Sequence, residues 1–500
     1  MHWYSRATTK STIRGRSLSS MDRCHTSSSG EATKHSSRGG LRRVRSATAV
    51  PTEPLVPTTS KATTKSTVRG RTLASRGTTK SATTEPSVPG RPPAPSRNWV
   101  KADLNSHLPD YNLAPRHVIY NIDPVSLFES FFDDDVVQYL CEMTELYAHN
   151  DKGDHEFSIA KDEMRCFLAI LLLSGYVGLP RWRMMWEVGT ETYLPAVAQA
   201  MRRNRFELIK RYMHCAGNSH LPPNDKFAKM RSLMCLLNER YLANAAFEEN
   251  LCIDESMAPY FGRHGAKQFL KGKPIRFGYK FWCLCDRLGY LMQFEPYQGS
   301  GGFGYDHNIG LGPSVVLDLI SELPQNVSFR LYADRYFSSL KLVDQLTALG
   351  FGYTGTIMSN RIEHAPVSSQ NEMSRKPRGY YDYRLDKMSN TLVVVWNDNR
   401  VVTVVSNNHT VNPVVPVLRW VSSEKRKVYV DQPHVIRQYN IFMGGVDRMD
   451  QNIDNYRVGI RSKKWWWPVL LFCVDTSCHN AWQLYKKSDR HKFHININYT

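Results

Sequence analysis

The stretch Leu251-Cys-Ile-Asp-Glu255 decides the fold, because a helical pattern ends before it and a different pattern begins with it. Leu251 and Ile253 point to one side of an extended chain and Asp254 to the other, which is the two-residue period of a β-strand. The stretch Leu331-Tyr-Ala-Asp334 is likewise a short apolar strand that ends in an acid. If the two strands are neighbours, their two carboxylates lie close together.

A second pair of acids lies in Gly444-Gly-Val-Asp-Arg-Met-Asp-Gln451. Asp447 and Asp450 are three residues apart, so on a helix they share one face. Carboxylates from two strand ends and a helix can converge on divalent cations. Two Mg²⁺ ions about 4 Å apart can serve both oxygens of a phosphodiester displacement, and Mg²⁺ needs only hard oxygen ligands. Spacing alone leaves a second interpretation open, in which each acid is a helix cap or a turn residue.

The composition favours a polyanionic partner. The chain has 500 residues and a net charge of +19, and residues 1–97 hold 18 Lys and Arg against 4 Asp and Glu. This segment is rich in Ser, Thr, Pro and Gly and repeats Ala7-Thr-Thr-Lys-Ser-Thr at 62–67. Its few large apolar residues cannot offset the entropy of ordering, so we expect a disordered basic tail. Such a tail is either a non-specific DNA-binding arm or a duplicated low-complexity segment.

Several classes of protein are excluded by the sequence. No apolar run reaches the roughly 18 residues that a membrane span needs, so no membrane partner is expected. The ten cysteines include no Cys-x-x-Cys pair, which disfavours a zinc site and favours reduced, buried thiols. A chain of this length is expected to form two or more domains.

The hydrophobic period predicts helices before residue 250 and a mixed sheet after it. Helices are predicted around 126–140, over 164–173 and over 201–213, the last with cations on its outer face. Between 251 and 359 we expect a strand, a hairpin (279–297), a helix (313–323), a strand (327–332), a helix (340–349) and a strand (351–357). This order predicts an α/β fold, a mixed sheet flanked by helices. A further hairpin is predicted at 392–406, and a helix from Trp465 to about Lys487 in which at least two of three tryptophans pack in the core.

Five blocks of this sequence resemble the conserved blocks of piggyBac-type transposases. The first catalytic block is similar to Ile253-Asp-Glu255 with the Gly278-Tyr-Lys280 that follows, and the second to Asp334-Arg-Tyr-Phe-Ser-Ser339. The third and most specific is similar to Met443-Gly-Gly-Val-Asp-Arg-Met-Asp-Gln451. The two flanking helical blocks resemble Met201-Arg-Arg-Asn-Arg-Phe206 and Lys463-Lys-Trp-Trp-Trp467.

The resemblance covers roughly 117–487 and implies a DDE/D transposase with an RNase H-like core. By matched position Asp254, Asp334 and Asp447 would form the catalytic triad and Asp450 a further metal ligand, with Mg²⁺ or Mn²⁺ as two ions. It implies metal-dependent cleavage and strand transfer at TTAA targets, double-stranded DNA and a homodimer as partners, and a nuclear location. The implied parts are the tail (1–97), a split helical dimerisation and DNA-binding domain (117–250 and 457–487), the core (251–359 and 434–456), an insertion (360–433) and a short tail (488–500).

Two departures from the family pattern leave an alternative function open. Arg335 follows the second acid where relatives commonly carry Asn, and it either pairs with DNA phosphate or perturbs metal binding. No cysteine follows Cys478, so no C-terminal Cys-rich zinc domain is evident. The alternative is a domesticated, transposase-derived protein that binds DNA without transposing.

Basic residues near the acids and near the tryptophans are the candidate DNA contacts. Those that follow Asp254 are interleaved with aromatic residues, and they either hold phosphates beside the cut or form a solvated hairpin face. The predicted contacts are Lys267, Lys271, Lys273, Arg276, Lys280, Arg335, Lys463 and Lys464.

Overall fold

The computed structural model describes residues 96–105, 108–114, 123–189, 191–219, 221–299, 306, 308–422 and 424–488, all within the second of two units of the chain, Ser87–Thr500. Apart from Ser96 and Arg97, the predicted tail lies outside these residues. The predicted tail ends too late in the sequence, because Arg97 belongs to the folded part. Its guanidinium forms ion pairs with Asp344, Glu363 and Asp386.

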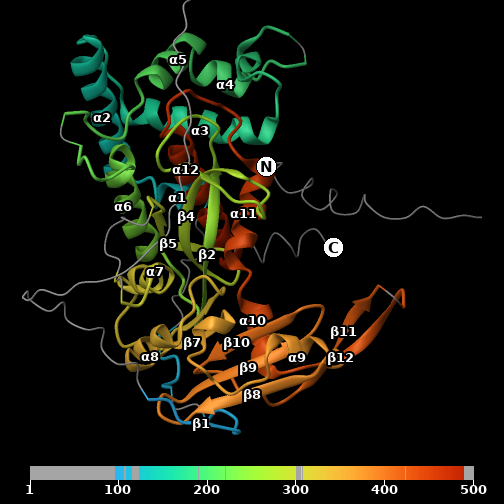
Figure 1. Cartoon of the computed structure of the whole chain (residues 1–500). Coiled ribbons are helices and arrows are strands. Elements are labelled where there is room, and N and C mark those ends of the chain that lie inside the picture. The colour runs from blue at the N-terminus through green and yellow to red at the C-terminus, as the bar shows by residue number, and fades with distance from the viewer. Residues whose placement is uncertain are drawn as a thin grey trace, which may run out of the picture. The chain divides into compact units, whose positions relative to one another are not determined.

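The helices predicted before residue 250 are confirmed. Asp123 and Asp133 cap the first two helices, since their carboxylates accept hydrogen bonds from backbone N–H groups in the first turn. Figure 1 shows this helical part at one end of the central strands, with the C-terminal helix running back into it. The elements are α1 (Pro124–Glu129), α2 (Asp134–Lys152), α3 (Lys161–Val177), η1 (Trp182–Trp186), α4 (Pro195–Ala200), α5 (Arg203–Tyr212), α6 (Ala228–Ala243) and the C-terminal α12 (Trp467–Lys487).

A mixed sheet forms the centre, as the sequence predicted, and ten of the described strands belong to it. Its order is β1-β8-β9-β10-β7-β6-β2-β4-β3, and β5 also pairs with β4. β2, β6 and β7 are parallel, whereas β4 and β10 run antiparallel to their neighbours. The strands that precede residue 360 are β1 (Trp99–Val100), β2 (Asn250–Pro259), β3 (Gln268–Phe269), β4 (Phe277–Asp286), β5 (Leu291–Pro296), β6 (Arg330–Ala333) and β7 (Gly352–Thr356), with α7 (Leu311–Ile320) and α8 (Leu340–Ala348) as connections.

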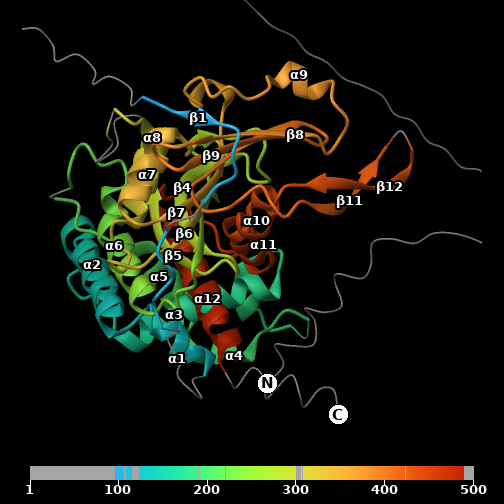
Figure 2. The same cartoon turned by 90° about the horizontal axis from the view of Figure 1, so that it is seen from below.

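The region expected as an insertion continues this sheet. β8 (Tyr381–Asp386), β9 (Thr391–Asn397) and β10 (Val401–Ser406) join it through the pairing of β10 with β7. Among the described strands, β11 (Val415–Val421) and β12 (Arg426–Gln432) alone form a separate two-stranded sheet. Both views show this ribbon extending away from the other strands (Figures 1 and 2).

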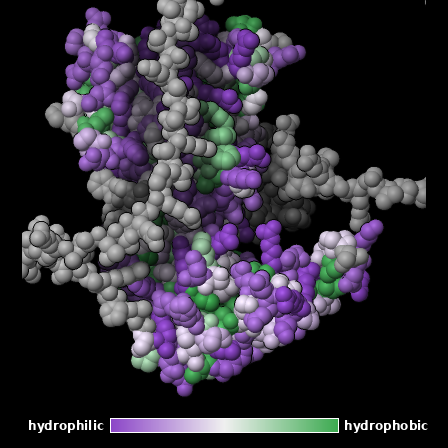
Figure 3. All heavy atoms as spheres, viewed as in Figure 1, coloured by the Kyte–Doolittle hydropathy of each residue, from purple (hydrophilic) through white to green (hydrophobic). Residues whose placement is uncertain are grey.

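The helices α10 (His434–Phe442) and α11 (Gly445–Tyr456) bring the chain back to the central strands. α9 (Gln370–Ser374) is a short helix that contacts β9 and β10. The larger of the two core clusters joins β2, β4 and β5 to α12 and to the other helices packed on them, and Trp466 and Trp467 are buried in it, as predicted. The face shown in Figure 3 is mainly hydrophilic over the helical part and over β8–β12.

The expectations on thiols and on membrane spans can be compared with the described part of the chain. Its nine cysteines are free thiols, and Cys24 lies outside it. None of the helices described is long and apolar enough to cross a membrane.

Candidate active site

The first two acids lie side by side on neighbouring parallel strands. β2 pairs with β6 in the register Ile253 to Ala333, so Asp254 and Asp334 each follow a paired residue. Asp334 directly follows the end of β6, as predicted, but Asp254 lies within β2, which continues to Pro259 because β4 pairs along its whole length. The middle of β2 and the end of the parallel strand β6 thus place the two acids next to each other on neighbouring strands.

Helix α11 places the other two acids against the same strand. Asp447 is in its first turn, and Asp450 follows one turn later. The Oγ atom of Ser256, in β2, donates a hydrogen bond of 2.6 Å to Oδ1 of Asp450. Gly445 makes this close approach possible, because a Cβ there would lie 2.2 Å from the carbonyl oxygen of Asp286 and 2.5 Å from the Sγ atom of Cys252.

One lysine connects the strand to the helix. The Nζ atom of Lys273 lies 3.3 Å from Oδ1 of Asp447 and 4.0 Å from Oδ2 of Asp254. It also donates a 3.2 Å hydrogen bond to the carbonyl oxygen of Glu255. The carboxylates of Asp254 and Asp447 therefore share one cation.

Burial disfavours the charged form of two of these carboxylates and raises their pKa values. Desolvation raises the pKa of Asp254 to about 7, although Lys273 opposes this shift. Desolvation likewise raises the pKa of Asp450 to about 6, against the hydrogen bond from Ser256. Burial alone would lower the pKa of Lys273, but Asp254 and Asp447 outweigh it and raise this pKa. Perturbed pKa values of this kind, at groups that lie close together, mark a candidate functional site.

The donor chemistry fits a hard divalent cation, because Asp254, Asp334 and Asp447 offer only carboxylate oxygens. In the conformation described, however, no group of three or more His, Cys, Asp or Glu side chains among the described residues is arranged to hold a metal ion. The charge shared by Asp254 and Asp447 is balanced by an ammonium group instead.

Comparisons with known proteins decide the family. A family model described as Transposase IS4 matches residues 123–482. The human PiggyBac transposable element-derived protein 3 is 43% identical over 396 residues, which are 78% of this chain and 66% of that protein. The human PiggyBac transposable element-derived protein 2 is 36% identical over 398 residues, 78% of this chain and 67% of that protein.

The chain belongs to the piggyBac-type transposase family. It spans about two thirds of the length of these relatives, and 37% of the human chimeric ERCC6-PGBD3 protein, to which it is 43% identical. Its fold is similar to that of the piggyBac transposase in a cryo-EM structure of a synaptic complex with hairpin DNA. The TM-score is 0.60 at 21% identity, covering 74% of this chain and 76% of that chain.

Five of the predicted DNA contacts lie on exposed or half-buried positions of this transposase-family chain. Lys271, Arg276 and Arg335 are exposed, and Lys267 is half-buried beside the ring of Phe277. Lys463 is also exposed, at the start of the segment that leads into α12. These five side chains are available to a ligand, whereas Lys273 is held between the acids.

The other two predicted contacts have partners within the protein. Lys280 is buried, with its Nζ atom 3.5 Å from the ring centre of Trp282 and 4.8 Å from that of Tyr297. Desolvation lowers its pKa to about 8. Lys464 donates hydrogen bonds of 2.8 and 2.9 Å to the carbonyl oxygens of Arg211 and Met213, at the C-terminal end of α5. It thus satisfies carbonyl groups that the helix leaves unpaired.

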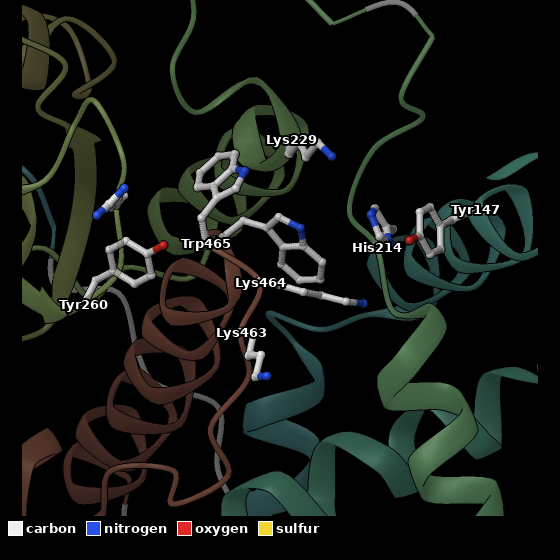
Figure 4. A pocket seen from close by; sticks show the side chains of 9 residues that line it. Tyr147, His214, Lys229, Tyr260, Lys463, Lys464 and Trp465 are labelled. Carbon is white, nitrogen blue, oxygen red and sulfur yellow. The ribbon is translucent and has the colours of Figure 1, made fainter. Parts of the chain in front are cut away.

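Two basic pockets meet at Lys463 and Lys464. Of the cations that line them, only these two were predicted as DNA contacts. One pocket of about 400 Å³ also contains Lys229 and Arg263, and Figure 4 shows Lys464 directed from the α12 segment toward His214 and Tyr147. The other, of about 570 Å³, has one acid, Glu207, in its lining. The outer cations predicted for the helix at 201–213 were the signal for part of this surface. Its further cations are Arg183, Lys210, Arg211 and Arg461.

Proposed function

We propose that this chain is a DDE/D transposase that cleaves DNA and transfers strands at TTAA targets in a metal-dependent reaction. Asp254, Asp334 and Asp447 are the proposed catalytic triad, and Asp450 is a further metal ligand. The observation that carries the proposal is the shared cation: Lys273 lies within 4.0 Å of carboxylates from β2 and α11. The adjacent Asp334 adds a third carboxylate from the neighbouring strand.

These residues would hold two Mg²⁺ or Mn²⁺ ions. Bound there, the ions would activate an oxygen nucleophile and stabilise the leaving oxygen of a phosphodiester. The protein's own contribution is placement. β2 and β6 fix Asp254 and Asp334 by their register, whereas Gly445 lets α11 lie close enough to present Asp447. The hydrogen bond from Ser256 holds Asp450 toward β2.

The strand arrangement supports an RNase H-like core within the proposed boundaries 251–359 and 434–456. Three strands in a row, β2, β4 and β5, are followed by β6 and β7, which run parallel to β2 on its other side. The helical residues of 117–250 and 457–487 pack together, since α12 contacts α1, α3 and α6. We assign dimerisation and DNA binding to this split helical domain.

We propose double-stranded DNA as the partner, bound by a nuclear homodimer. The two pockets at Lys463 support a phosphate backbone as ligand, because eight cations and one acid line them. The solved relative with the similar fold was captured in a synaptic complex with hairpin DNA. Lys267, Lys271, Arg276 and Arg335 would extend the contact toward the acids.

An excision assay tests the catalytic assignment. Purified protein and a plasmid with an element flanked by TTAA are incubated with Mg²⁺ or Mn²⁺, and the wild type is compared with Asp254→Ala and Asp447→Ala. We expect excision by the wild type and a loss of at least 100-fold in both variants. Asp454→Ala is the matched control, because Asp454 is an exposed acid on α11. Equal excision by wild type and triad variants would overturn the assignment.

The second candidate is a domesticated DNA-binding protein without transposition activity. It is favoured by the basic pockets, which are lined mostly by the helical domain, with Tyr260 and Arg263 from the core, and do not need the acids. Binding to duplex DNA that falls steeply with salt, together with no excision by the wild type under any metal, would support this function over the first.

A further inference from the structure

Lys273 reaches the acids from a loop that connects two strands of the sheet. β3 and β4 are joined by residues 270–276, and the N–H of Leu270 donates to the carbonyl oxygen of Arg276 across the base of this loop. Lys273 is in the middle of the loop. The positions on either side, Lys271 and Arg276, are exposed, whereas the Lys273 side chain is 21% exposed. The loop therefore turns one of its three cations inward.

The two carboxylates that it meets differ in their need for a counter-charge. The side chain of Asp254 is 14% exposed and that of Asp447 is 60% exposed. A buried charge without a partner is costly, whereas an exposed one is solvated. Lys273 thus stabilises mainly Asp254, and its hydrogen bond to Asp447 fixes the first turn of α11 beside β2.

A lysine suits a contact that must be reversible. Its ammonium is a compact point charge on a flexible stem and does not form the two parallel hydrogen bonds of a guanidinium. An ammonium shared by Asp254 and Asp447 and a divalent ion shared by them require the same place. Two unit charges 4 Å apart repel by about 4 kcal/mol even at an effective dielectric constant of 20. Metal and ammonium therefore exclude each other.

We propose that Lys273 is a resident counter-ion that holds Asp254 and Asp447 in register before metal loading and is displaced when a divalent cation binds. The released ammonium then joins Lys271 and Arg276 on the outer side of the loop as a contact for DNA phosphate. This inference rests on the proposed function, because it needs the metal site at Asp254 and Asp447. It adds a positioning residue that couples metal loading to the strength of DNA binding.

Mn²⁺ binding to the full chain without DNA tests the exchange. Free Mn²⁺ is followed by electron paramagnetic resonance in titrations of the wild type, Lys273→Met and Lys271→Met. We expect Lys273→Met to bind Mn²⁺ about tenfold more tightly, because the competing cation is gone. Lys271→Met, the exposed neighbour in the same loop, should bind as the wild type does.

Thermal unfolding supplies a second readout that does not depend on activity. Without metal, Lys273→Met should melt at a lower temperature than the wild type, since Asp254 loses its counter-charge. Saturating Mn²⁺ should remove most of this difference. Unchanged or weaker Mn²⁺ affinity in a Lys273→Met protein that still melts cooperatively would overturn the exchange.

Asp254→Asn separates this failure from a failure of the proposed function. If Asp254→Asn loses Mn²⁺ binding while Lys273→Met binds as the wild type does, only the exchange is wrong. If Asp254→Asn binds Mn²⁺ as tightly as the wild type, the metal site at these acids is wrong, and the exchange falls with it.

Discussion

The side chain of Asn480 pairs with the backbone of Leu291 as a neighbouring strand would. Its Oδ1 atom accepts a hydrogen bond from the N–H of Leu291, and its Nδ2 atom donates one to the carbonyl oxygen of the same residue, both at 2.8 Å. Leu291 begins β5, and Asn480 lies in the middle of α12. One amide therefore joins the C-terminal helix to the edge of the central strands.

Replacing this amide should destabilise the fold. Asn480→Leu leaves the N–H and C=O of Leu291 buried without partners, and each such group costs about 1–3 kcal/mol. We expect the free energy of unfolding in urea to fall by roughly 2–5 kcal/mol. Cys478→Ala, at an exposed position of the same helix, should change it little. Similar stabilities of the two variants would show that the pairing contributes nothing.

Gly445 should tolerate no side chain, whereas Gly444 should. A Cβ at Gly445 would clash with the carbonyl oxygen of Asp286 and the Sγ atom of Cys252, but one at Gly444 meets no atom within 4 Å. Gly445→Ala must push α11 away from β2, at a cost of about 1–3 kcal/mol. Because Asp447 moves with the helix, excision should fall as well. Matched urea unfolding and excision curves of the two alanine variants check this, and equal behaviour would contradict the packing argument.

Replacing the buried Asp475 should stabilise the protein in a pH-dependent way. Burial in α12 raises its pKa to about 7, against the attraction of Arg457, while an unfolded chain has an Asp pKa of about 3.9. The folded state therefore binds a proton that the unfolded state has lost, and stability declines as the pH rises from about 4 to about 7. Asp475→Asn removes this penalty and should be stabilising by roughly 2–4 kcal/mol at pH 8.

The stability gained by Asp475→Asn should be much smaller at pH 5, because the Asp475 carboxyl of the folded wild type already carries the proton there. Urea unfolding at the two pH values measures it. Asp454→Asn is the comparison, since this exposed acid forms an ion pair with the same Arg457 and should have a small effect at both pH values. An equal gain at pH 5 and pH 8 would show that the charge of Asp475 is not the cause.

Alanine substitutions of the neighbours Lys463 and Lys464 should affect different properties, DNA binding in one case and stability in the other. Lys463 is exposed, so Lys463→Ala should weaken DNA binding, reduce the slope of log affinity against log salt by about one, and leave stability unchanged. Lys464 donates to three carbonyl groups, of Lys210, Arg211 and Met213, so Lys464→Ala should lower the melting temperature. Salt-dependent binding and thermal unfolding of both variants distinguish the roles. A reversed pattern would assign the contact to Lys464.

Much of the fold could be predicted because its elements are encoded locally. The hairpins at 279–297 and 392–406 have mainly apolar runs on either side of short polar turns, and both are present as β4–β5 and β9–β10. Residues 360–390 are polar and irregular, so β8 gave no comparable signal. Its strand is stabilised by pairing with β9 and β1 rather than by its own pattern.

The site was predictable in its acids but not in its cations. The strand that ends before Asp334 and the helix that carries Asp447 were visible in the sequence, whereas the continuation of β2 beyond Asp254 was not. Whether a lysine meets solvent, an aromatic ring or an acid depends on how distant segments fold against it. Lys273, Lys280 and Lys464 were all assigned to DNA, yet the structure gives each of them a partner within the protein.

The three ion pairs of Arg97 determine where the basic N-terminal segment can be truncated. Residues 99–100 pair with Asp386 and Leu385 at the outer strand of the sheet, and Arg97 fixes them through three acids. An uncovered outer strand is a template for association with other chains. A truncation that begins after Val100 is therefore expected to aggregate in light scattering, whereas one that begins before Arg97 should keep the protein monodisperse.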